Sequence, residues 1–307
     1  MLKIIQHRKI WFIISGSLCL LSILSLIFWG LKPAIDFTGG TLMEIEFSQI
    51  PRPTVNEIKE VLSPLNLGDL RIQYFGDKGV LFRLKNIDED THQKILKSLE
   101  DKFGSKDKKV IEEKRFESIG PIIGKELSNK AKWSITLVVI MIIVYVAWAF
   151  RRVSKPVSSW KYGLAAIAAL VHDILITTGI FSVLGHFLNV EIDILFITAL
   201  LTILGYSVND TIVVFDRTRE NLHRHPEEGF DEVVNRSVNE TIVRSINTSL
   251  TTLFVLLSVF FLGGRTIRYF VLALIFGVIF GTYSSIFIAS PLLVTWEKLR
   301  RKKQFKR

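Results

Sequence analysis

Three ionisable side chains lie inside long apolar stretches of this 307-residue sequence. Asp173, in "AALVHDILITTG", is about 11 residues into one stretch, or ~16 Å of helix, and Asp210, in "LGYSVNDTIVVFDR", is about six residues, or ~9 Å, from the end of the next. Arg244, in "ETIVRSINTSLTT", lies near the start of the stretch that follows. A charge inside hydrocarbon must be paired or neutralised by a proton. The three residues, with Asn209 beside Asp210, therefore predict a proton relay, in which Asp210 and Arg244 lie at similar depth and can pair.

A purely structural role is the alternative for each polar group. Asn209 and Asp210, the "ND" pair, can hydrogen-bond neighbouring helices for about 1 kcal/mol or less. Arg244 can extend to the membrane surface along its aliphatic stem. Asp173 can hydrogen-bond its neighbour His172. A carboxylate has a short reach, so the structural reading is weakest for Asp210.

The composition indicates a membrane protein and excludes several other classes. Apolar residues make up 49% of the chain, they cluster in long blocks, and the net charge is +10. Residues 32–132 hold 18 Lys and Arg against 17 Asp and Glu, so the basic excess lies beside the apolar blocks. Membrane orientation explains such an excess better than nucleic-acid binding does. Cys19 is the only cysteine, which excludes an intrachain disulfide and a thiolate metal site, and the sequence indicates no cofactor.

Six stretches are long enough to cross the ~30 Å hydrocarbon core as helices. They cover residues 11–31, 132–150, 162–184, 192–215, 242–262 and 269–296. The first is longer than a signal-peptide core and no cleavage site follows it, so we expect it to stay as an anchor. The uninterrupted apolar run of the second span, residues 134–150, is short by itself and needs residues 131–133 to complete a crossing.

Lys and Arg in the short flanking segments predict the orientation. Residues 1–10, the loop with Arg151, Arg152 and Lys155, and the basic tail 297–307 all fall on one side of six crossings. Both termini are therefore expected in the cytoplasm. Residues 32–131 then form a domain outside.

The outer domain shows strand and helix periodicities in the order βαββαβ. The expected strands are 41–47, 70–75, 80–84 and 110–117, and the expected helices are 54–65 and 90–103. This order is that of a ferredoxin-like α+β domain. No catalytic set is visible in it, and His92 is expected on a solvated helix face. The predicted architecture is an all-α bundle of six transmembrane helices with one extracytoplasmic ferredoxin-like domain between spans 1 and 2.

The motif "DFTGG" connects the first span to the first expected strand. It comprises Asp36, Phe37, Thr38, Gly39 and Gly40. Two consecutive glycines favour a tight turn with backbone angles that other residues avoid. At a membrane exit, the pair also permits a change of angle, and we expect a hinge there.

Two further patterns concern helix packing. Gly277 and Gly281 form a GxxxG motif in the last span, which favours close helix contact. Residues 230–242 repeat apolar side chains at helical spacing, and we expect a helix that lies along the cytoplasmic interface, with a plain surface helix as the alternative.

Four separated motifs resemble the SecF family, the six-span subunits of the bacterial SecDF protein-export complex. They are "DFTGG", "GPIIGKEL", "GYSVNDTIVVFDRTREN" and "RSINTSLTT", in this order, and the resemblance covers nearly the whole chain. The family belongs to the resistance-nodulation-division type of proton-driven membrane proteins.

The resemblance implies an accessory, non-enzymatic role in the Sec pathway of the bacterial inner membrane. With SecD as partner, such a subunit uses the proton motive force at late steps of translocation, after the SecYEG channel and SecA have begun export. It implies proton passage at Asp210 and Arg244, and places "DFTGG" at the membrane exit. The family's contacts are the translocating polypeptide, accessory Sec subunits and membrane lipid.

Two other functions compete with this interpretation. A proton-coupled exporter of small molecules or lipids shares the same bundle chemistry but usually has twelve spans. An intramembrane aspartyl protease would use Asp173 and Asp210 as its acid pair. Its Gly-x-Gly-Asp motif is absent, because Ser207 and Val208 precede the "ND" pair.

Overall fold

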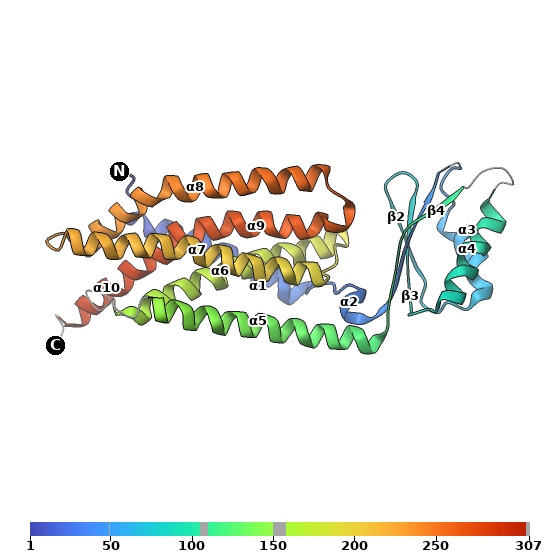
Figure 1. Ribbon diagram of the computed structural model, residues 1–307, viewed down its shortest axis with the longest axis horizontal. Coiled ribbons are helices and arrows are strands. Elements are labelled where there is room, and N and C mark those ends of the chain that lie inside the picture. Colours follow the sequence, from blue (N-terminus) through green and yellow to red (C-terminus); the bar gives the residue numbers. More distant parts are fainter. Residues whose placement is uncertain (49, 105–109, 150–157, 305–307) are drawn as a thin grey trace. The chain divides into compact units, whose positions relative to one another are not determined.

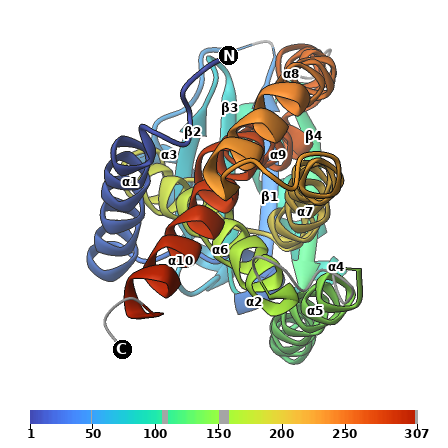
Figure 2. The ribbon, with the colours of Figure 1, turned by 90° about the vertical axis from the view of Figure 1, so that its left-hand side faces the viewer.

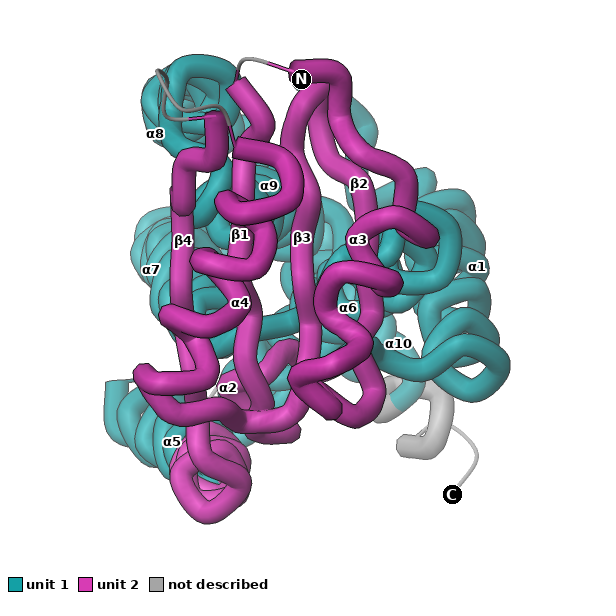
Figure 3. Tube along the Cα trace, turned by 90° about the vertical axis from the view of Figure 1, so that its right-hand side faces the viewer, with its two compact units in different colours: residues 1–32, 133–307 teal, residues 33–132 magenta. Residues whose placement is uncertain are grey.

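The computed structural model describes residues 1–48, 50–104, 110–149 and 158–304. These residues form two compact units, residues 1–32 with 133–307 and residues 33–132 (Figure 3). The expected end of the second span at Phe150, the basic loop residues Arg151, Arg152 and Lys155, and the last three tail residues lie outside the described residues.

Within the described residues, six helical segments are long and apolar enough to cross a membrane. The helices that form them are α1 (Arg8–Phe28), α5 (Pro121–Ala149), α6 (Ser159–Leu188), α7 (Ile194–Arg224), α8 (Phe230–Leu262) and α9 (Arg268–Ser284), the last continued by a π-turn (Ser285–Ala289) and α10 (Ser290–Gln304) (Figure 1). The N-terminus and α10 lie at the same end of this unit (Figure 1).

The third and sixth spans form the inside of the bundle (Figure 2). They bury 56% and 61% of their most apolar windows, against 17% or less for the first, second and fifth. Polar side chains on α6 and α9 must therefore find partners within the protein.

Helix α9 reaches the fourth span through its glycines. A Cβ built on Gly277 would lie 2.0 Å from Ile203 Cγ1 of α7, and one on Gly281 would lie 3.2 Å from Ser207 Cβ. Only a residue without a side chain allows this separation. The small-residue motif in the last span thus serves close helix contact, as predicted.

The expected interfacial helix over residues 230–242 is wrong. These residues are the first three turns of α8, continuous with the fifth span. Phe230, Val233 and Val238 are buried in the core of the bundle. Asn235 Oδ1 accepts a hydrogen bond from the backbone N–H of Ile5 (3.2 Å). The apolar stripe is covered by the protein itself rather than by lipid, which periodicity does not distinguish.

The second unit contains a four-stranded antiparallel sheet in the order β2-β3-β1-β4. The strands are β1 (Gly40–Phe47), β2 (Arg71–Phe75), β3 (Gly79–Leu84) and β4 (Ile111–Ile119). Helices α3 (Val55–Leu62), followed by the one-turn helix Ser63–Leu65, and α4 (Glu89–Phe103) cover one face of the sheet (Figure 3). The core under these helices includes Met43, Ile45, Ile58, Phe82 and Leu99. Strands and helices follow one another in the predicted order.

His92 contradicts the expectation of a solvated residue. It is 5% exposed, its Nε2 lies 2.7 Å from Glu113 Oε1, and its Nδ1 lies 3.1 Å from Glu89 Oε1. Its ring stacks on Phe116 at 3.7 Å. An imidazole flanked by two carboxylates and an aromatic ring is satisfied when buried. The sequence spacing does not show that β4 brings Glu113 and Phe116 to this helix face.

The first turn of α4 makes the outer domain sensitive to acid. The Thr91 side chain and backbone N–H hydrogen-bond to the Asp88 carboxylate and hold its pKa below the ordinary value. A lowered folded-state pKa adds stability above the unfolded pKa, and that stability is lost as the pH falls through the folded-state pKa. We expect amide protection in this turn, corrected for intrinsic exchange, to fall below about pH 4.

Hydrogen exchange in the full chain checks this prediction, with Asp88→Asn as the control. Asparagine caps a helix about as well as aspartate but has no proton to lose. The variant should keep the helix cap, and amide protection in this turn should no longer fall below about pH 4. An equal loss of protection in acid in both proteins would contradict the prediction.

Candidate functional site

Asp173 is completely buried among polar groups of three spans. Ser207 Oγ of α7 donates to its Oδ2 at 2.6 Å, and Ser284 Oγ of α9 donates to the same oxygen at 2.8 Å. His172 Nδ1 lies 2.9 Å from Oδ1. The close approach at Gly281 holds α9 where Ser284 can reach it.

Asp210 is partly buried and held by two other serines. Ser245 Oγ of α8 donates to Oδ1 at 2.6 Å, and Ser285 Oγ of the π-turn after α9 donates to Oδ2 at 2.5 Å. Each carboxylate therefore receives one hydroxyl from the sixth span and one from another span. Among the ion pairs of the described residues, neither aspartate has a Lys or Arg partner.

A second layer of hydroxyls lies one helical turn from Asp210. Tyr206 Oη is 3.1 Å from Ser249 Oγ, and Ser249 also hydrogen-bonds Thr282. Thr282 in turn contacts the Asp210 layer, because Ser285 Oγ donates to its carbonyl oxygen at 3.0 Å. Hydroxyl groups can both donate and accept, so such layers can pass protons.

His172 carries a buried nitrogen without a partner. Its side chain is 5% exposed and stacks on Tyr283, with ring centroids 5.9 Å apart. Within the described part of the chain, Nε2 has no hydrogen-bond partner. Tyr283 Oη accepts from Ser15 Oγ of α1 at 3.1 Å. Buried polar atoms without a hydrogen-bond partner are uncommon in proteins.

The ion pair expected between Asp210 and Arg244 is not formed in the described residues. Arg244 is exposed on α8, and its neighbour Ser245 is the residue that turns toward Asp210. Asn209 is also exposed, on α7. Consecutive residues of a helix point about 100° apart, so the equal depth of Asp210 and Arg244 does not place them on facing sides. The sequence singled out both carboxylates, whose proton-relay role stays a prediction, and it missed Ser207 and Ser245 as their partners.

The "DFTGG" glycines serve conformation and close packing together. Residues 35–38 form the short helix α2 (Ile35–Thr38), in which Thr38 Oγ1 donates to Ala34 O at 3.1 Å. Gly39 has φ +71° and Gly40 φ +129°. A Cβ on Gly39 would lie 2.8 Å from Pro121 Cα, and a Cβ on Gly124 would lie 2.8 Å from Gly39 N. The motif therefore packs against the "GPIIG" segment at the start of α5.

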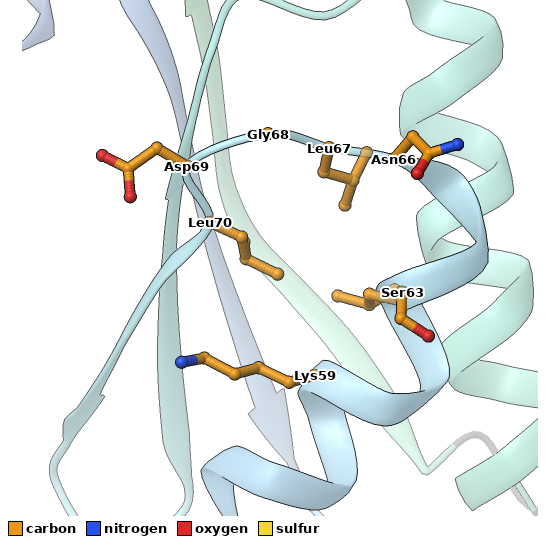
Figure 4. Close-up of a pocket in the computed structure, with 8 residues that line it drawn as sticks. Lys59, Ser63, Asn66, Leu67, Gly68, Asp69 and Leu70 are labelled. Carbon is orange, nitrogen blue, oxygen red and sulfur yellow. The ribbon is translucent and has the colours of Figure 1, made fainter.

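A shallow, open hollow lies in the outer domain. It has a volume of about 520 Å³ and lies between the end of α3 and the loop before β2 (Figure 4). Lys59, Ser63 and Asp69 give it polar edges, but it contains no nucleophile with a base beside it among the described residues. The membrane carboxylates remain the stronger site.

Comparisons with known proteins agree on one family. The family "Protein export membrane protein SecD/SecF, C-terminal" matches residues 98–299, and "SecD/SecF GG Motif" matches residues 25–49. The protein translocase subunits SecF of Thermobaculum terrenum and Anaerolinea thermophila are 41% and 37% identical, covering 97% and 100% of this chain and 94% and 98% of theirs.

A solved structure shares the fold. The translocon-associated membrane protein SecDF of Thermus thermophilus matches 96% of this chain at 33% identity and a TM-score of 0.77. This chain spans 38% of the length of that SecDF chain. The six spans, both family matches and the full-length relatives lead to one conclusion: the chain belongs to the SecF family of protein translocase subunits.

Proposed function

We propose that this chain couples the proton motive force to late steps of protein translocation, together with SecD and downstream of SecYEG and SecA. It acts in the bacterial inner membrane with both termini in the cytoplasm. The observation that carries the proposal is the pair of membrane carboxylates, Asp173 and Asp210, held by hydroxyls and His172 with no Lys or Arg partner in the described residues.

Proton exchange follows from the cost of an unpaired charge. An ionised carboxylate inside a membrane bundle needs a cation or a proton to offset its lost hydration. Serine hydroxyls donate to the charged form and can accept from the neutral form, so both states keep hydrogen bonds. Ser245 and Ser285 are the hydroxyls in contact with Asp210, and a proton that reaches this carboxylate passes them.

Arg244 and Asn209 act at a surface of the bundle in this proposal. Both are exposed although they lie on membrane-crossing helices. An arginine facing lipid is costly, whereas one facing a carboxylate of another subunit is satisfied. We therefore assign the exposed faces of α7 and α8 to contact with the SecD bundle, where Arg244 meets a SecD acid.

The free energy needed to drive the proposed two-state change is larger than one proton supplies. One charge crossing ~100 mV releases ~2.3 kcal/mol. Driving a two-state element from 1:99 to 99:1 takes ~5.5 kcal/mol. Two protons, one on each aspartate, supply ~4.6 kcal/mol at that voltage. Protonation of both carboxylates therefore comes close to completing the switch, whereas protonation of one carboxylate does not.

The outer domain is the moving part of the proposed cycle. We assign it to the ferredoxin-like class, which its strand order and its two helices support. Movement would begin at the "DFTGG" connection, from Asp36 to Gly40. The packing of Gly39 against Pro121 means that both membrane connections of the domain move together.

Co-purification tests the partner part of the proposal. The tagged chain, extracted from its native membrane, should recover SecD. Arg244→Gln should weaken SecD binding by about 2–5 kcal/mol, which is about thirtyfold or more in affinity, because it leaves a SecD acid without a counter-charge, and SecD recovery should fall accordingly. Arg268→Gln, also exposed, is the matched control and should leave recovery unchanged. Normal recovery with Arg244→Gln would remove the assigned contact.

A further inference from the structure

Two consecutive serines connect the two carboxylates. Ser284 Oγ donates to Asp173 of α6, and Ser285 Oγ donates to Asp210 of α7. Adjacent helical residues point about 100° apart, so one turn of α9 reaches both neighbouring spans at once. Any rotation or translation of this turn changes both contacts together.

A π-turn begins at the second of these serines. Residues Ser285–Ala289 form it, between α9 and α10. Its cause is Pro291, which has no backbone N–H and whose ring would collide with the carbonyl four residues earlier in a regular α-helix. Ser290 Oγ donates to the Ser285 carbonyl at 3.2 Å, spanning five residues. π-turns are rare, and they are frequently found at functional sites.

We infer that Ser284 and Ser285 are positioning residues that tie Asp173 and Asp210 to one register of the sixth span, and that the π-turn is the element that changes register when protons bind. This inference rests on the proposed function. A carboxylate that takes up a proton no longer requires two donors, so its serine can turn away. The π-turn holds one extra residue, and shifting it along the helix rotates the serines without unfolding the span.

The π-turn also packs against the core of the bundle, through which a change of register at the serines can reach α7 and α8. Ser285 and Ala289 are fully buried, and Ile286 and Leu293 lie in the same core cluster as Phe215 of α7 and Val234 of α8. A register change at the serines therefore repacks the cytoplasmic half of the bundle, because close-packed interiors do not deform continuously.

The test compares export into inverted membrane vesicles with and without a proton gradient. We define the stimulation ratio as export with a proton gradient divided by export without one. Ser284→Ala and Ser285→Ala should each lower this ratio at least about threefold toward one, since each removes a hydrogen bond to a charged group. Ser285→Thr keeps the hydroxyl and should restore most of the ratio. Thr295→Ala, which removes a hydroxyl that donates only to its own helix carbonyl, is the matched control and should leave the ratio unchanged.

Pro291→Ala tests the π-turn separately. Alanine supplies the missing N–H and lets the span become regular, so the variant should be at least as stable as the native chain. It should nevertheless lose at least half of the gradient stimulation while its SecD recovery stays normal. A native ratio in Pro291→Ala, or in both serine variants, overturns the inference.

One comparison separates the two proposals. If Asp210→Asn abolishes stimulation while the serine and proline variants keep it, only the inference fails. If Asp210→Asn keeps the native ratio, the proposed function fails first.

Discussion

Replacing Asp210 with Asn is expected to bring the ratio of export with and without a proton gradient close to one. Asparagine keeps the size of the side chain; its Oδ1 can accept from one of the two serines and its Nδ2 can donate to the other, but it binds no proton. The gradient-independent export supported by SecA should persist. Import of a secreted precursor into inverted vesicles measures both quantities in one preparation.

Asp216→Asn is the matched control for this prediction. Asp216 lies six residues further along α7 and pairs with Arg219 at 2.8 Å near the end of the helix. Its loss removes a surface ion pair worth about 1 kcal/mol or less. Export should keep its native ratio. A full native ratio in Asp210→Asn would show that this carboxylate carries no proton in the cycle.

Gly277→Ala is expected to destabilise the bundle, because the added methyl group would collide with a buried side chain of the neighbouring helix. The new Cβ would lie 2.0 Å from Ile203 Cγ1, and Ile203 is 1% exposed. The α7 and α9 helices must separate, or Ile203 must leave its position. Overpacking of this kind costs about 1–3 kcal/mol, and separating α9 from α7 also pulls the serines from the carboxylates.

Two further variants isolate the cause. Ile203→Ala in the same chain removes the colliding atoms and should recover most of the lost stability, so the two changes are coupled. Gly205→Ala has nothing within 4 Å of its new Cβ and should be neutral or stabilising by up to about 1 kcal/mol. Thermal unfolding of the purified complex in detergent ranks all four proteins. Additive losses in the double variant would contradict the steric explanation.

Much of the bundle could be predicted from the sequence because its signals are local. Long apolar runs predict spans directly, and the GxxxG motif predicts the close approach of the last one. The glycines of "DFTGG" indicate unusual backbone angles, and Gly39 and Gly40 have them. The partner of this motif was not predictable, because Pro121 is about 80 residues away.

The contacts of the site could not be predicted because they depend on helix rotation. Depth along a span follows from residue counts, and it correctly placed Asp210 and Arg244 together in height. The direction of a side chain depends on how each helix packs, and a difference of one residue exchanges Arg244 for Ser245. The prediction that His92 is solvated was wrong for a related reason, because β4, which is distant in the sequence, covers this side chain.

Infrared difference spectroscopy tests the central claim most directly, because the carbonyl stretch of a protonated carboxyl is resolved from that of the charged form. Membranes of the native complex, compared at the two ends of the pH range in which export operates, should show carboxyl bands that vanish separately in Asp173→Asn and Asp210→Asn. Identical spectra for the native complex and both variants would contradict proton binding by this site.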